Sequence, residues 1–85
     1  MGELSWSASY FWHRILRCLE DKLGSLTVSA WFDQTKVVTF CENKLVLEEC
    51  SIFRRELISK RYVCLIQEVV QEEFGIAIEV ILQDV

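Results

Sequence analysis

The first third of the chain carries apolar residues at the spacing of an amphipathic helix. From Ser9 onward they recur at intervals of three and four residues, and Gly24 follows at a position where a helix would end. The stripe consists of Phe11, Trp12, Ile15, Leu16, Leu19 and Leu23. The pattern predicts a first helix from Ser9 to Leu23.

A shorter apolar pattern follows in the stretch SLTVSAWFDQ. Ser25 and Thr27 both carry hydroxyls of the kind that cap helix N-termini. Val28, Trp31 and Phe32 come next at helical spacing. We therefore expect a short second helix of about two turns, at 3.6 residues per turn, capped by one of the two hydroxyls.

Two stretches rich in β-branched and aromatic residues, KVVTF and KLVLE, flank the tetrapeptide Cys41-Glu42-Asn43-Lys44. Asn43 tolerates the positive φ that a tight hairpin turn demands. The pattern predicts two antiparallel strands joined by this turn. The closing stretch IAIEVIL is again rich in β-branched residues and predicts a third strand.

The longest apolar stripe lies between the second and third predicted strands. Ser51 is a suitable N-cap, and Gly75 follows the last residue of the stripe. The stripe consists of Phe53, Leu57, Ile58, Tyr62, Leu65, Ile66, Val69 and Phe74. It predicts a helix of about six turns.

The predicted order is helix, helix, strand, strand, helix, strand, which indicates an α+β fold with a three-stranded sheet and helices against one face. We expect residues 1–8 to form a flexible lead-in and residues 9–85 to form a single domain, since 85 residues suffice for one core only. The core is expected to bring together Trp31, Phe32, Phe53, Tyr62 and Phe74.

Composition and charge exclude several classes of function for this chain. The net charge of -4 disfavours a general nucleic-acid binder, and no apolar run approaches the roughly 20 residues of a membrane span, so we expect no membrane partner. The four cysteines form no C-x-x-C pair, and the single histidine, His13, fits no zinc-ligand spacing. We therefore expect reduced and mostly packed thiols, with no metal and no cofactor.

Motifs of catalysis are also missing from the sequence. The chain has three glycines and no Gly-rich phosphate-binding loop, so nucleotide binding is not expected. The pairs Glu48-Glu49 and Glu72-Glu73 are interpreted as a solvated strand end and a solvated helix face. We predict that the chain is not an enzyme.

The stretch SIFRRELISKRY concentrates four cationic side chains in an acidic chain. Arg54 and Arg55 fall in the first turn of the predicted long helix, where the helix dipole favours acidic residues. Two interpretations stay open at this point. The stretch is either a solvated helix face, with Glu56 and Lys60 at pairing distance, or a docking surface for a partner.

Several phrases of the sequence together resemble a known family. Trp12 is followed by Trp31, then by a predicted hairpin, and then by the aromatic-led helix IFRRELISKRYVCLI. From about Tyr10 to Val80 this order resembles the N-terminal domain of DnaA, the bacterial chromosomal replication initiator. Family members usually carry A-P-N before the helix-leading phenylalanine, where this chain has Glu49-Cys50-Ser51, and Ser51 takes the place of the asparagine cap.

The resemblance implies a fold similar to type II KH domains and a cytoplasmic module that acts through other proteins. It implies weak homodimerisation with Trp12 as the self-association residue, together with recruitment of the replicative helicase and of initiation regulators. The partner-docking residues would be Ser51, Phe53 and Arg54. Some members carry a helicase-contact glutamate where this chain has Thr27. From the residues alone, Trp12 and Phe53 are equally well explained as packed core aromatics.

Two alternatives to this function remain. One is a KH-like domain that contacts single-stranded DNA weakly through Arg54, Arg55, Lys60 and Arg61, although the G-x-x-G loop of such domains is missing. The other is a stand-alone regulator that mimics the initiator domain.

Overall fold

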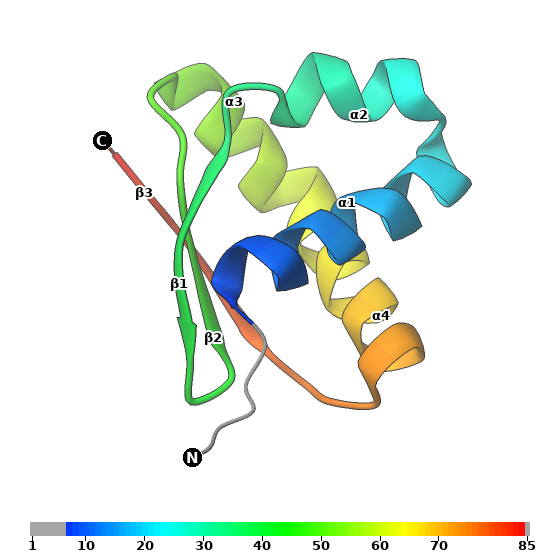
Figure 1. The fold of residues 1–85 in the computed structure, drawn as a ribbon. Helices are drawn as coiled ribbons and strands as arrows, with labels where there is room; N and C mark the ends of the chain where they lie inside the picture. Colours follow the sequence, from blue (N-terminus) through cyan, green and yellow to red (C-terminus); the bar gives the residue numbers. More distant parts are fainter. Residues whose placement is uncertain (1–6, 85) are drawn as a thin grey trace.

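The computed structural model describes residues 7–84 (Figure 1). Its elements follow the predicted order, and the fold is α+β as expected. They are α1 (Ala8–Leu23), α2 (Ser25–Phe32), β1 (Lys36–Cys41), β2 (Lys44–Glu48), α3 (Ile52–Leu57), the π-helical turn η1 (Ile58–Tyr62), α4 (Val63–Phe74) and β3 (Glu79–Gln83). Most of the predicted lead-in lies outside the described residues.

The first two helices are joined by a single residue. The Ser7 hydroxyl caps α1 by accepting a hydrogen bond from the Tyr10 amide at 3.1 Å. Gly24 then ends α1 and begins α2 with a φ of 89°, a conformation that side chains with a Cβ rarely adopt. The predicted hydroxyl cap of α2 is therefore wrong, because the glycine occupies the cap position and Ser25 is already helical.

The sheet is mixed, with strand order β1-β2-β3. β1 and β2 form the predicted antiparallel hairpin, and Cys41 pairs with Lys44 across a turn in which Glu42 and Asn43 have φ values of 54° and 62°. Positive φ at both central positions is the signature of a type I′ turn. β3 adds to β2 in parallel, after the long helix has crossed the sheet.

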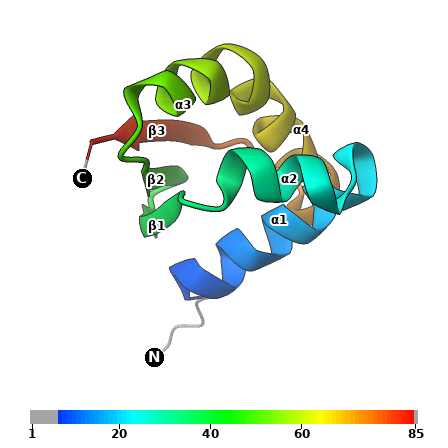
Figure 2. The same cartoon turned by 90° about the horizontal axis from the view of Figure 1, so that it is seen from above.

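One face of the sheet packs against the helices (Figures 1 and 2). Leu45 and Leu47 of β2 point into this interface and are fully buried, and their β3 partners Val80 and Leu82 pack against the same core. From α1, the fully buried residues Ile15 and Leu19 enter the core in the predicted stripe. The hydrophobic periodicity of the sequence thus correctly identified the buried faces of these elements.

The long helix contains a π-helical turn that the sequence pattern did not predict. Ile58, Tyr62 and Ile66 lie at intervals of four, slightly more than the 3.6 residues of an α-helical turn. The wider turn of η1 keeps Ile58 and Ile66 fully buried and Tyr62 in contact with the same core. Gly75 ends the helix with a φ of 71°, as predicted.

Among residues 7–84, the aromatic side chains form two clusters instead of the single predicted one. In the first, the ring of Phe11 lies 4.1 Å from that of Phe40 and 4.8 Å from that of Phe74, measured between centroids. The second consists of Trp12, Trp31, Phe32 and Tyr62. Phe53 belongs to neither, because its side chain lies at the start of α3 with 68% of its surface exposed.

Within residues 7–84, no helix has both the length and the apolar character needed to cross a membrane.

Candidate functional site

Two large apolar side chains stand exposed on the first turn of α3. Ile52 is 66% exposed and Phe53 is 68% exposed. Among the described residues, the other large exposed hydrophobic side chains are Tyr10, Leu26 and Val38, which are isolated from one another in the sequence. Ile52 and Phe53 with their flanking residues Ser51 and Arg54 include the residues predicted to dock a partner, and they are called the docking surface below.

The start of α3 is fixed by Ser51, as the sequence predicted. Its hydroxyl accepts a hydrogen bond from the Arg54 amide at 3.2 Å, and its carbonyl accepts one from the Arg55 amide at 2.9 Å. The structure therefore brings three predicted docking residues, Ser51, Phe53 and Arg54, into one helical turn.

Directly before this turn lies a buried acidic residue. The Glu49 side chain is 0% exposed, so its interpretation as part of a solvated strand end is wrong. Oε1 accepts a hydrogen bond from the Thr35 hydroxyl at 2.8 Å, and Oε2 accepts one from the Ser51 amide at 3.1 Å. Strand alternation provided a signal for this, because Glu49 continues the inward series of Leu45 and Leu47.

The two arginines of the first turn reach back to acceptors outside α3. Nη1 of Arg54 lies 3.9 Å from Oε2 of Glu49. Nη1 of Arg55 donates hydrogen bonds to the Glu49 carbonyl at 2.6 Å and to Oδ1 of Asp84 at 3.2 Å. These contacts account for the unfavourable position of the arginines in the helix dipole, since each is compensated by a nearby oxygen.

The remaining predicted nucleic-acid residues lie further along the helix. Lys60 and Arg61 are exposed on η1. A shallow hollow of about 270 Å³ beside them is lined by Ile52, Arg55, Glu56, Ser59, Lys60 and Leu82. Of the four cations, Arg54 and Arg55 contact oxygens of Glu49 and Asp84 within the chain.

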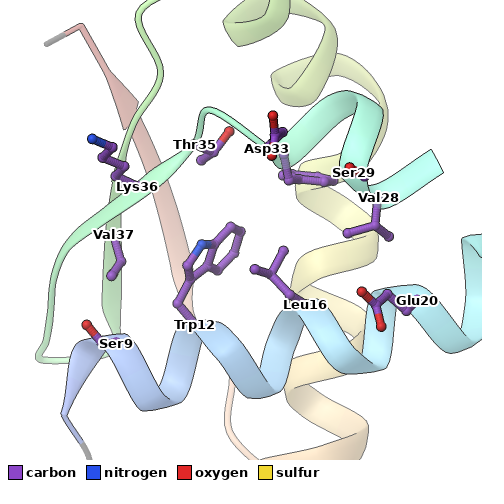
Figure 3. A pocket seen from close by; sticks show the side chains of 11 residues that line it. Ser9, Trp12, Leu16, Glu20, Val28, Ser29, Asp33, Thr35, Lys36 and Val37 are labelled. Carbon is purple, nitrogen blue, oxygen red and sulfur yellow. The ribbon is translucent and has the colours of Figure 1, made fainter. Parts of the chain in front are cut away.

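Trp12 belongs to a different part of the molecule. Its side chain is only 5% exposed and packs edge-on against Phe32, with ring centroids 5.9 Å apart. It also lines a hollow of about 530 Å³ between α1, α2 and β1, and Figure 3 shows the indole ring directed into that space from α1. Leu16 and Val37 contribute further apolar surface to the same hollow.

The thiols differ from the expectation of mostly packed cysteines. All four are free, but only Cys18 is partly buried, whereas Cys41, Cys50 and Cys64 are exposed. Burial, together with the nearby Glu73 carboxylate, raises the pKa of the Cys18 thiol. Within residues 7–84, no three His, Cys, Asp or Glu side chains are grouped so as to hold a metal ion.

The fold and the docking surface define a small α+β domain that presents an apolar helix start to solvent. Comparison with known families agrees with this class: the family described as the DnaA N-terminal domain matches residues 9–72. The chain belongs to this family, which confirms the resemblance inferred from its sequence. A search of curated proteins finds no match to the chain.

Proposed function

We propose that this domain is a protein-protein interaction module of a replication initiator, and that its docking surface recruits the replicative helicase and initiation regulators at the origin. Membership of the DnaA N-terminal family supports the link to replication initiation. In this proposal the domain performs no catalysis and binds no cofactor, and its partners are cytoplasmic proteins.

The observation that carries the proposal is the exposure of Phe53 beside Ile52, at 68% and 66%. Leaving two adjacent large apolar side chains in water forfeits the free energy of their burial, about 1.5 to 3 kcal/mol for each side chain. Aromatic residues flanked by arginine are the types that anchor protein interfaces. Arg54 provides such a flank within the same turn.

Truncation of Phe53 tests the proposal. Phe53→Ala should weaken binding to the replicative helicase of the source organism at least about tenfold, because anchor aromatics at interfaces contribute about 2 kcal/mol or more. Val38→Ala is the matched control, since Val38 is an exposed apolar side chain, 45% exposed on β1. Binding is measured by isothermal titration calorimetry, with circular dichroism to show that both variants are folded. Equal affinities of Phe53→Ala and wild type would remove Phe53 from the site.

The proposal also includes weak self-association through α1, with Trp12 as its contact residue. Because Trp12 is 5% exposed, a second copy reaches it only by entering the hollow between α1, α2 and β1. A contact confined to this hollow buries a small area between the two copies, and we therefore propose a weak dimer.

Substitution of Trp12 is a poor test of self-association, because truncating a buried tryptophan costs about 3 to 5 kcal/mol of stability. Ser9 lies exposed at the rim of the same hollow, so Ser9→Arg blocks access without opening the core. We expect this variant to keep its melting temperature and to lose dimer in sedimentation equilibrium. An unchanged dimer fraction would show that copies associate through another face.

A further inference from the structure

We infer that Glu49 is a positioning residue of the docking surface: it holds the first turn of α3 in the arrangement that presents Ile52 and Phe53. The inference rests on the proposed function for its biological meaning. Its structural part, that Glu49 orders the helix start, can be measured without any partner.

The first argument is the burial of the Glu49 carboxylate. A buried carboxylate loses most of its favourable hydration, and apolar residues of similar volume often give equal or greater stability at such sites. Glu49 is nevertheless fully buried, and both of its oxygens accept hydrogen bonds, from the Thr35 hydroxyl and the Ser51 amide. Fixing one local arrangement explains this residue better than a gain in stability does.

The second argument is the position of the contacts along the chain. Glu49 is anchored to the sheet, because its amide donates a hydrogen bond of 3.0 Å to the Gln83 carbonyl. Its carboxylate holds the Ser51 amide and lies 3.9 Å from Arg54, and its carbonyl accepts from Arg55 at 2.6 Å. These contacts lie on both sides of the exposed pair Ile52 and Phe53.

The exposed pair is not anchored in the hydrophobic core. Ile52 and Phe53 show about two thirds of their surfaces to solvent and lie outside the buried core cluster. Their orientation therefore depends on the turn in which they lie, which the Ser51 cap and the Glu49 carboxylate hold together. A surface held in its binding arrangement avoids the cost of ordering upon association, and apparent affinity falls in proportion to the fraction of molecules so arranged.

Two substitutions separate the contributions of hydrogen bonding and charge. Glu49→Ala removes both acceptors, so we expect helicase binding to weaken about tenfold, as it would if the arranged state fell to about a tenth of the molecules. Glu49→Gln retains an acceptor for the Ser51 amide and a polar partner for Thr35, so its affinity should stay within about twofold of wild type. Ile66→Val, in the core of α4, is the control for a general loss of stability.

Amide hydrogen exchange provides the readout that needs no partner. In Glu49→Ala the amides of Arg54 and Arg55 should exchange at least about tenfold faster than in Ile66→Val. Both donate to Ser51 and not to Glu49, so their protection reports the order of the helix start. Unchanged exchange at these amides would overturn the inference, whatever the helicase does. A second outcome would overturn the role of Glu49 in binding. In it, exchange rises in Glu49→Ala and Phe53→Ala weakens helicase binding, but Glu49→Ala leaves helicase binding unchanged. If Phe53→Ala has no effect, the proposed function fails and exchange alone decides the role of Glu49.

Discussion

The hydroxyl of Thr35 donates a hydrogen bond of 2.8 Å to Oε1 of Glu49, and both side chains are buried. The two residues lie 14 positions apart, Thr35 just before β1 and Glu49 just after β2. The bond therefore joins the connection that follows α2 to the connection that precedes α3. Through it, the start of α3 is tied to both ends of the hairpin.

This bond gives a first prediction about stability. Thr35→Val preserves shape but leaves one oxygen of a buried carboxylate without its donor, which should lower the free energy of unfolding by about 1 to 3 kcal/mol. Chemical denaturation monitored by circular dichroism measures the change. The control is Thr39→Val in the exposed part of β1, where we expect a change within about 0.5 kcal/mol. A similar result for both variants would contradict a structural role for the Thr35 hydroxyl.

The N-termini of α3 and α2 give a second prediction, because of these two helices only α3 has a side-chain cap bond. Ser51→Ala removes the acceptor of the Arg54 amide and should destabilise the fold by about 1 kcal/mol. Ser25→Ala is matched to it, because Ser25 begins α2 without a side-chain cap bond and should change stability little. Thermal unfolding of the two variants side by side makes the comparison. Equal losses of stability in the two variants would show that the effect of Ser51 does not come from capping.

The hairpin turn gives a third prediction. Glu42 has a φ of 54°, which costs a residue with an ordinary side chain roughly 1 kcal/mol. Glu42→Asn should therefore stabilise the fold by a few tenths to about 1 kcal/mol, because asparagine adopts this region more readily. Glu42→Gln removes the same charge and retains the strain, so its melting temperature should stay near that of wild type. Stabilisation of Glu42→Gln to the same extent would trace the effect to charge.

The thiols give a fourth prediction. Cys41, Cys50 and Cys64 are exposed, whereas Cys18 is partly buried and its pKa is raised by burial and by the Glu73 carboxylate. Because the thiolate is the reacting form, Cys18 should be alkylated more slowly than the other three at pH 8. Peptide mass spectrometry after timed iodoacetamide treatment gives the four rates. Unfolding in urea should remove the difference, and persistence of slow labelling there would exclude the folded environment as its cause.

Local patterns predicted much of the fold. Amphipathic periodicity identified α1 and the long helix, the turn residues identified the hairpin, and Ser51 and Gly75 marked the ends of the long helix. Two local details were missed, the cap of α2 and the π-helical turn η1. Both depend on how a helix meets its neighbours, since Gly24 serves two helices at once and η1 keeps Ile58 and Ile66 on one core.

The candidate site was predicted in part. Ser51, Phe53 and Arg54 do share one turn, but whether Phe53 or Trp12 is exposed could not be read from the chain, because each is an aromatic residue on an apolar stripe. Only the packed structure shows that Trp12 is buried against Phe32 and that Phe53 lies in solvent.

By itself, the sequence determined the order of the elements, the inward faces of α1 and β2, and the family, since these depend on the periodicity and identity of neighbouring residues. The tertiary structure decided which polar groups meet. Glu49 bonds Thr35, which lies in another connection, and Arg55 bonds Asp84, which follows β3 and is 29 positions away. Such contacts arise where distant segments of the backbone converge, and no local pattern encodes that convergence.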